Sequence, residues 1–230
     1  WADVNKDGYL DVFGCHDDAL SRMWTGSSNA TLTPAPALIP LDDYLLADYV
    51  GNDHSGNYGT VFTDFDNDGD VDLILGNLGL NYKYQASEEK PFRVYLNDFD
   101  KNATYDIVLS YKSDDTEYPV RGRQCSSQQM PSIKEKFKNY NSFASASLEE
   151  IYSDEILEES LKYEITSFQS VHLENKDGVF NAKELPYQAQ LSNINSIVVK
   201  DVDSDGNLDA LLGGNLYNAE VETPRNDASY

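Results

Sequence analysis

Four short apolar runs, each placed directly after a polar loop, are the most regular feature of the chain. The runs are Val12-Phe13, Leu73–Leu75, Ile107–Leu109 and Ala210–Leu212. Apolar segments of this length, bounded by Asp, Asn and Gly, are typical of β-strands, whereas helices need longer segments with a 3.6-residue period. The pattern therefore predicts a repeated loop–strand unit.

A helical pattern interrupts these strands between Pro131 and Tyr163. Ser132 with Glu135, and Ser147 with Glu150, match the capping box that starts a helix. Apolar positions at helical spacing continue the pattern: Ile133, Phe137, Tyr140, Leu148, Ile151, Tyr152, Leu157 and Leu161. We expect two or three short helices over about 131–163, followed by a β-hairpin in the stretch FQSVHLENKDGVF, from Phe168 to Phe180.

The polar loops share the pattern D-x-[DN]-x-[DN]-G-x-x-D. They run from Asp3 to Asp11, Asp64 to Asp72, Asp98 to Asp106 and Asp201 to Asp209. Only the third loop departs from the pattern, with Ala103 in place of the glycine. Repeats separated by tens of residues indicate propellers, solenoids or arrays.

The spacing within each loop suits a calcium ion. Side-chain oxygens at positions 1, 3, 5 and 9, with the carbonyl oxygen of position 7, make a shell of hard ligands that calcium prefers. Without a cation, each pair of carboxylates at such distances repels by roughly 1 kcal/mol even in bulk water. The candidate ligands are Asp3, Asn5, Asp7, Tyr9 and Asp11; Asp64, Asp66, Asp68, Asp70 and Asp72; Asp98, Asp100, Asn102, Thr104 and Asp106; and Asp201, Asp203, Asp205, Asn207 and Asp209.

Two other classes of calcium loop are excluded by position 12. An EF-hand requires a bidentate Glu there, and a dockerin-type loop also expects an acidic residue. The four loops have Gly14, Leu75, Leu109 and Leu212 at this position. We expect the site at 98–106 to be the weakest of up to four calcium sites, because a non-glycine residue in the left-handed region costs roughly 1–2 kcal/mol.

The loops, with the segments LILGNLGLN (Leu73–Asn81) and LLGGNLYNAE (Leu211–Glu220), resemble the FG-GAP/VCBS repeat family. These repeats are the blades of integrin-α-type β-propellers, and bacterial VCBS-repeat and cartilage-acidic-protein-like chains are the most similar. The resemblance implies an all-β fold of propeller blades with calcium-binding loops, and it implies calcium ligation by the residues named above. With four loops, we expect either a partial propeller or part of a larger one.

The spacing of the loops predicts how this fold is interrupted. Successive loops start 61, 34 and 103 residues apart, whereas a four-stranded blade needs about 40 residues or more. We therefore expect propeller repeats over 1–110, a small, mainly helical insertion over 111–190, and a further repeat over 191–230. The strand expected before Asp3 is missing, which favours a piece of a longer protein.

Charge excludes two classes of partner. The chain has 40 acidic and 17 basic residues and a formal net charge of −23. Nothing in it could neutralise a run of nucleic-acid phosphates, and an anionic membrane would repel it. No stretch of 18 apolar residues exists that could span a membrane. Cations and cation-bridged partners are the natural complement of this composition.

Several other residues could carry chemistry, and for most of them a structural role is favoured. His16 with Asp17 and Asp18 could bind a metal, but they fit a polar loop; His54 and His172 are not expected to be catalytic. Arg121 and Arg123 could bind an anionic ligand, although ion pairs with acidic neighbours are the simpler interpretation. Cys15 and Cys125 could pair or stay free, with Cys125 expected to be buried. Asn29 begins a glycosylation sequon.

The sequence thus predicts a non-catalytic, extracellular calcium-binding module that binds a protein or glycan, or that packs into a surface assembly. Extracellular calcium is abundant enough for loops of modest affinity. The alternative is the propeller domain of a secreted hydrolase or lyase acting on polysaccharide. A surface-layer or filament subunit is a third possibility.

Overall fold

The structure is a computed structural model that describes residues 3, 5–10, 12–14, 22–25, 27–28, 33–34, 59–217 and 226–227. The chain divides into two compact units, and each is considered by itself. Unit 1 comprises Trp1–Gln85 and Ser167–Tyr230, and unit 2 comprises Ala86–Thr166. Seven residues singled out in the sequence lie outside the described residues: Asp11, Cys15, His16, Asp17, Asp18, Asn29 and His54.

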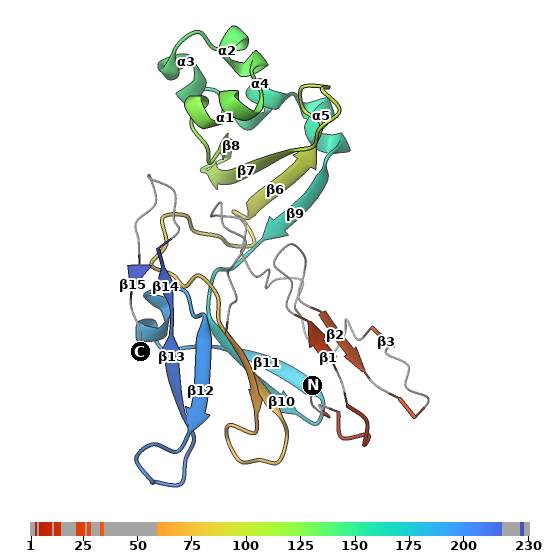
Figure 1. Cartoon of the computed structure of the whole chain (residues 1–230), viewed down its shortest axis with the longest axis vertical. Helices are drawn as coiled ribbons and strands as arrows, with labels where there is room; N and C mark the ends of the chain where they lie inside the picture. The colour runs from red at the N-terminus through yellow and green to blue at the C-terminus, as the bar shows by residue number, and fades with distance from the viewer. Residues whose placement is uncertain are drawn as a thin grey trace. The chain divides into compact units, whose positions relative to one another are not determined.

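Unit 1 consists of antiparallel strands (Figure 1). Its elements are β1 (Val12–Gly14), β2 (Arg22–Thr25), β3 (Thr33–Pro34), β4 (Thr60–Thr63), β5 (Asp72–Leu75), β10 (Val171–Lys176), β11 (Val179–Glu184), the 3-10 helix η3 (Tyr187–Gln190), β12 (Ser196–Lys200), β13 (Asp209–Gly213), β14 (Asn215–Leu216) and β15 (Asn226–Asp227). The strands form the sheets β1-β2-β3, β11-β10-β5-β4, β12-β13 and β14-β15.

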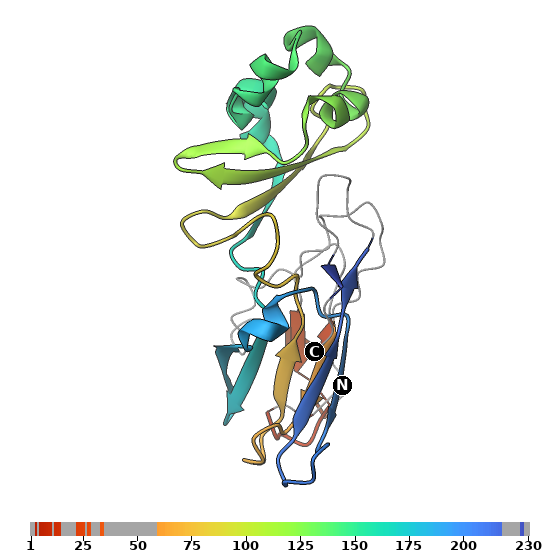
Figure 2. The same ribbon diagram turned by 90° about the vertical axis from the view of Figure 1, so that its left-hand side faces the viewer.

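The best-described sheet of unit 1 is built from two hairpins that are far apart in sequence. Strand β5 pairs with β4 on one side and with β10 on the other, placing His172 opposite Ile74. All four residues of β5 are buried, which explains why this strand is a continuous apolar run after its aspartate rather than an alternating one. Strand β12 lies against β4, and the two hairpins run side by side in both views (Figures 1 and 2).

Two glycines allow this close approach. A Cβ atom on Gly59 would lie 2.9 Å from Ile197 Cγ1, and one on Gly76 would lie 2.5 Å from the Ile194 carbonyl oxygen. At the same place, the Gly59 N–H donates to the Ile194 carbonyl at 2.7 Å. Gly59 and Gly76 therefore allow backbone-to-backbone packing between the neighbouring hairpins.

Unit 2 is a four-stranded antiparallel sheet with helices on one face. Its strands are β6 (Phe92–Asn97), β7 (Asp106–Ser113), β8 (Thr116–Pro119) and β9 (Leu161–Ile165), in the order β8-β7-β6-β9. Its helices are α1 (Arg123–Gln129), α2 (Ser132–Lys136), α3 (Tyr140–Ala144), α4 (Leu148–Tyr152) and α5 (Asp154–Glu159). All of the helices are short, so tertiary packing must hold them in place.

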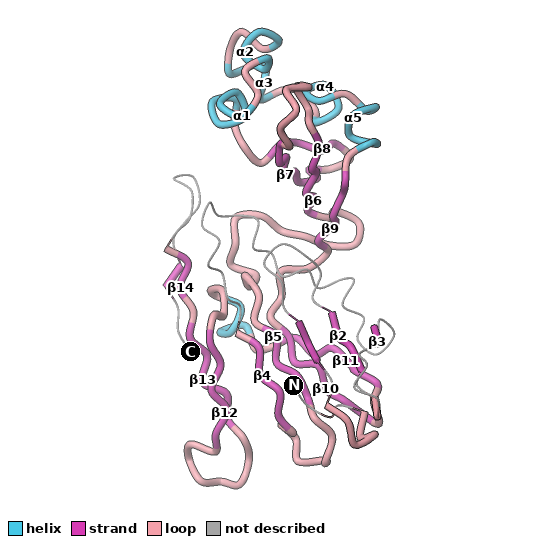
Figure 3. Tube along the Cα trace, turned by 45° about the vertical axis from the view of Figure 1, so that its right-hand side comes forward, coloured by secondary structure: helices cyan, strands magenta, loops and turns pink. Residues whose placement is uncertain are grey.

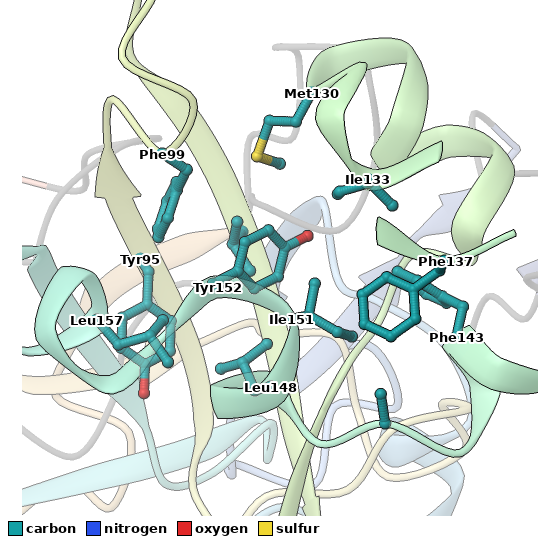
Figure 4. Packing of buried hydrophobic residues seen from close by; sticks show 12 residues of the cluster. Tyr95, Phe99, Met130, Ile133, Phe137, Phe143, Leu148, Ile151, Tyr152 and Leu157 are labelled. Atoms are coloured by element: carbon teal, nitrogen blue, oxygen red, sulfur yellow. The ribbon is translucent and has the colours of Figure 1, made fainter. Parts of the chain in front are cut away.

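The core of unit 2 joins these helices to the sheet (Figure 4). Tyr95 and Val108 from the sheet lie in one buried cluster with Leu148, Ile151 and Tyr152 from α4. The Phe99 and Tyr152 rings contact each other at a tilt, with 5.1 Å between ring centroids, and Phe137 meets Phe143 edge-on at 5.5 Å. Six of the eight apolar positions of the helical pattern thus lie in the hydrophobic core, whereas Tyr140 and Leu161 are exposed.

The predicted mainly β character of the chain is confirmed, since most of its described elements are strands in antiparallel sheets; in unit 2, however, the five short α-helices comprise more residues than the four strands. The sheets of the described residues are separate, and no closed barrel or propeller is present among them. Short helices were expected over about 131–163; they begin earlier, at Arg123, and end at Glu159. Ser147 and Glu150 form the expected capping box, whereas Ser132 lies inside α2, after Pro131 at the N-cap position.

The compact units do not follow the predicted boundaries at 110 and 190. The third polar loop and its two strands belong to unit 2, because β6 pairs with β9 and packs under the helices. The expected hairpin is present as β10–β11, but it completes the sheet of β4 and β5 in unit 1. Unit 2 therefore interrupts that sheet between its second and third strands.

In the part of the chain that the structure describes, each helix is too short to cross a membrane.

Candidate metal centres in the repeated loops

The repeated loops connect adjacent antiparallel strands in the same register. We call them loops 1 to 4 in chain order, at 3–11, 64–72, 98–106 and 201–209. Loops 2, 3 and 4 join β4 to β5, β6 to β7, and β12 to β13, with the pairs Thr63↔Asp72, Asn97↔Asp106 and Lys200↔Asp209. In each of these loops, the residue before position 1 pairs with position 9 across the antiparallel ladder. Three different sequences therefore form loops with one backbone arrangement, which we call the loop frame. In Figure 3 the loops after β4 and β12 lie at the same end of unit 1.

The backbone of all four loops turns in the same way. Position 4 has positive φ in each: 57° at Lys6, 59° at Asn67, 60° at Lys101 and 63° at Ser204. Position 6 does too: 88° at Gly8, 93° at Gly69, 67° at Ala103 and 91° at Gly206. The left-handed backbone expected at Ala103 is present, and glycine elsewhere at position 6 avoids its cost.

The carboxylate at position 1 anchors each turn. Its Oδ2 atom accepts the N–H of position 6 at 2.9 Å in loop 1, 3.0 Å in loop 2, 2.8 Å in loop 3 and 3.0 Å in loop 4. The position-9 carboxylate accepts the N–H of position 2 in the three loops where it is described, at 2.9, 3.2 and 2.9 Å. Positions 1 and 9 are therefore fixed by the backbone and turned towards each other.

Three groups of carboxylates are close enough to hold a metal ion. Each offers three ligand atoms within 4.8 Å of one another, and the groups are Asp64, Asp66 and Asp72; Asp98, Asp100 and Asp106; and Asp201, Asp203 and Asp209. These are positions 1, 3 and 9 of loops 2 to 4. Asp68 and Asp205 at position 5 are not in the groups, because each accepts the N–H of position 7, at 2.9 and 2.8 Å.

Two of these groups contain a buried oxygen atom without a hydrogen bond. Asp64 Oδ1 in loop 2 and Asp100 Oδ1 in loop 3 are both shielded from solvent and accept no hydrogen bond. A buried carboxylate oxygen left in this state is costly. Burial also raises the pKa of Asp66 and, in loop 3, that of Asp106. A cation between the carboxylates would satisfy both oxygens, so the residues fit a hard divalent ion.

The β10–β11 turn supports loop 2 from one side. Asp72 is fully buried, and its Oδ1 atom accepts the Asn175 N–H at 2.9 Å while its Oδ2 atom accepts the Phe65 N–H at 2.9 Å. Asn175 Nδ2 donates to the Val71 carbonyl at 3.1 Å, and the Asp177 N–H donates to Asp70 Oδ2 at 2.9 Å. Loop 2 is the best preorganised of the candidate centres.

Loops 3 and 4 differ in how far their position-9 carboxylates are shielded from solvent. In loop 3 Asp106 is 3% exposed and also accepts a hydrogen bond from Gln129 of α1, so the helices of unit 2 support this centre. In loop 4 Asp209 is exposed. The prediction that loop 3 binds most weakly rests on Ala103 and stays a prediction; the structure adds that the carboxylate group of loop 3 is more buried than that of loop 4.

Arg123 and His172, which were also singled out in the sequence, have structural contacts. Arg123 donates its Nε–H to the Phe137 carbonyl at 2.6 Å, and its guanidinium lies 5.3 Å from the centre of the Tyr140 ring. His172 lies 3.5 Å from Asp72 Oδ2 and 5.5 Å from the Phe65 ring. The prediction that Cys125 is buried is wrong: it is an exposed free thiol.

Contacts from outside the loops were missed by the sequence reasoning. Asn175, Asp177 and Gln129 support loops 2 and 3 from segments that are distant in sequence. No motif marks these residues, and only the pairing of β10 with β5 brings the hairpin turn to loop 2.

Comparisons of the chain with protein-family models, with curated proteins and with solved structures gave no match.

Proposed function

We propose that this chain is a calcium-binding β-repeat module of the FG-GAP/VCBS type, whose sheets are blades of a propeller. The observation that carries the proposal is the recurrence of one loop frame with a carboxylate group at its centre. The buried oxygens of Asp64 and Asp100 support it independently, because they lack any hydrogen-bond donor. Pairing of β4, β5, β10 and β11 into one four-stranded antiparallel sheet is what a blade requires.

The chain's own residues define what a bound ion would do. Positions 1, 3 and 9 are already gathered in loops 2 to 4, and position 5 would turn inward on binding. Calcium supplies positive charge that neutralises the gathered carboxylates and locks the turn between two strands. In loop 2 this would also fix Asp72, which ties β5 to the β10–β11 turn. Calcium would therefore act on the stability of the sheet rather than on a reaction.

For this module we propose an extracellular, non-catalytic role in binding a protein or glycan, or in surface assembly. The net charge of −23 suits a setting in which divalent cations are abundant. Calcium at extracellular concentration would saturate loops of modest affinity. A turnover screen against polysaccharides, with calcium present, distinguishes this role from that of an enzyme.

Thermal unfolding with and without calcium tests the proposal. At a calcium concentration of 100 times Kd, each site adds about 2.7 kcal/mol to the free energy of unfolding. For a site in unit 1, which has about 150 residues, the gain corresponds to roughly 5–10 °C in Tm. We expect EDTA to lower the Tm by at least this amount, and excess calcium, but not equal magnesium, to restore it.

Matched variants make the test specific. Asp66→Asn removes a ligand charge from loop 2 and should reduce the calcium-dependent gain. Asp114→Asn makes the same chemical change at an exposed turn outside the loops and should leave the gain unchanged. An identical Tm in calcium and EDTA would overturn the proposal, as would equal behaviour of the two variants.

A further inference from the structure

Loop 3 is the candidate metal centre that lies against the helices of unit 2. Its position-9 residue, Asp106, is 3% exposed and accepts the Phe99 N–H at 3.2 Å as well as a hydrogen bond from the Gln129 side chain of α1. The same centre contains the Asp100 Oδ1 atom, which is buried without a hydrogen bond. A helix therefore holds one carboxylate of a group that has an oxygen left to satisfy.

Position 2 of loop 3 is part of the hydrophobic core under the helices. The Phe99 ring is buried and contacts the Tyr152 ring of α4, with 5.1 Å between ring centroids. The N–H of the same residue holds Asp106. In loop 4, position 2 is Val202, which is 69% exposed. Loop 3 is thus attached to α4 through a residue whose counterpart in loop 4 lies in solvent.

The residue before loop 3 is held by another helix. Asn97 pairs with Asp106 across the ladder, and its Nδ2 atom donates to the Ile156 carbonyl of α5 at 3.2 Å. Its Oδ1 atom accepts the N–H of Asp98, which is position 1 of the loop, at 2.8 Å. Three helices, α1, α4 and α5, therefore contact the residues that bring the carboxylates of loop 3 together.

We propose that loop 3 and the helices of unit 2 form one calcium-responsive structure, in which Gln129 and Phe99 are positioning residues for calcium binding. The inference rests on the proposed function of the loops. Packed helices hold Asp106 in the orientation that can bind an ion, and a bound ion in turn fixes Asp106 for its contact with α1. Because such coupling is reciprocal, calcium stabilises the packing of α1 by the same factor by which that packing strengthens calcium binding.

Gln129→Leu tests the contact from the helix side, without altering the loop itself. The substitution removes the amide donor to Asp106 and keeps a side chain of similar size. Losing the hydrogen-bond partner of a metal-binding side chain typically weakens metal binding by about 10–100-fold, and we expect a loss of this size in the calcium affinity of loop 3. Gln128→Leu is the matched control, because it makes the same change at the adjacent, exposed residue of α1, and it should leave the affinity unchanged.

Two amides report on the loops separately in a calcium titration of the full chain followed by ¹H–¹⁵N NMR. The Ala103 N–H donates to Asp98 Oδ2 at 2.8 Å in loop 3, and the Gly69 N–H donates to Asp64 Oδ2 at 3.0 Å in loop 2. Gln129→Leu should weaken the affinity obtained from Ala103 and leave the affinity obtained from Gly69 unchanged. A general loss of stability would not produce this difference.

Hydrogen exchange of the unsubstituted protein tests the reciprocal effect and does not depend on how a variant folds. The Met130 N–H donates to the Ser126 carbonyl at 2.9 Å, so its exchange reports on the opening of α1. Saturating calcium should slow this exchange by about 10–100-fold, the factor expected for the affinity. In Gln129→Leu the slowing should be smaller.

The outcomes separate this inference from the proposed function. Equal loop 3 affinities in Gln129→Leu and Gln128→Leu would overturn the inference alone, as would Met130 exchange that is the same with and without calcium. A response to calcium at Gly69 but not at Ala103 would also overturn it, because loop 3 would then not be a metal centre. If neither amide responds, the proposed function fails as well.

Discussion

Substituting alanine for Gly206 measures the backbone strain that the loop frame imposes. Gly206 is at position 6 of loop 4 with φ +91°, and a Cβ atom there would have no neighbour within 4 Å. Steric overlap with other residues is therefore absent, and the cost is that of a non-glycine residue in the left-handed region, about 1–2 kcal/mol. Reduced freedom of the unfolded chain returns about 0.4–1 kcal/mol.

The expected net loss is about 1 kcal/mol, which corresponds to roughly 2–4 °C in Tm for a unit of this size. Thermal unfolding in EDTA measures the loss without any contribution from ions. Ala103→Gly makes the reverse change at φ 67° in loop 3 and should raise the stability of unit 2 by a similar amount.

Gly122→Ala is the matched control for this pair. Gly122 also has open space around a Cβ atom, but its φ is −68°. The substitution should change stability by less than about 0.5 kcal/mol. If Gly206→Ala were as neutral as Gly122→Ala, the left-handed turn would not exist in solution, and the common loop frame would be refuted.

The remaining predictions concern burial and charge. In urea unfolding with EDTA present, Asp72→Asn should lower the free energy of unfolding by about 1–3 kcal/mol, because an amide can accept only one of the two backbone N–H bonds to buried Asp72. Asp209→Asn, at an exposed residue, should lower it by less. Leu148→Ala should destabilise unit 2 by about 2–5 kcal/mol, since Leu148 is 0% exposed, and an unchanged midpoint would contradict the core. The Asp177 N–H and an ion pair with Lys6 lower the pKa of Asp70 from its ordinary value of 3.8, so its ionised form stabilises the fold at pH values above 3.8, and this stability is lost as the pH falls through the folded-state pKa. Lys6→Met should therefore reduce the fall of the urea midpoint below about pH 4. An equal fall in both proteins would contradict the ion pair.

The strands and the loops could be predicted because their signals are local. Five aspartates within Asp64–Asp72, followed by an apolar run, define a turn and a strand without reference to the rest of the chain. The left-handed position 6 follows from the glycine, and the exception at Ala103 was expected from sequence alone. The capping box at Ser147 is local in the same sense.

The pairing of distant segments could not be predicted in this way. Strand β10 begins 96 residues after the end of β5, the strand it pairs with, from Leu75 to Val171. Nothing in the hairpin sequence specifies that partner. The assignment of loop 3 to unit 2 also depends on β9, which was expected to end a helical segment. The spacing of 34 residues between loops 2 and 3 was the available signal, because it is too short for a complete blade.

The burial and the contacts of each candidate centre could not be predicted from the local sequence pattern either. Loops 2 and 4 have the same residues at positions 1, 3, 5, 6 and 9, yet Asp72 is buried and Asp209 is exposed. The difference arises from the Asn175 and Asp177 contacts, which only the tertiary structure supplies. Composition and spacing therefore predict a metal site, whereas its strength depends on neighbouring turns.

A high-resolution crystal structure of the protein grown in millimolar calcium tests the central claim most directly. The account predicts anomalous density at the centre of loop 2, about 2.3–2.6 Å from oxygens of Asp64, Asp66 and Asp72, with Asp68 turned inward to join them. Loops without density at these positions, with Asp64 Oδ1 bonded to a protein donor or to water instead, would contradict it.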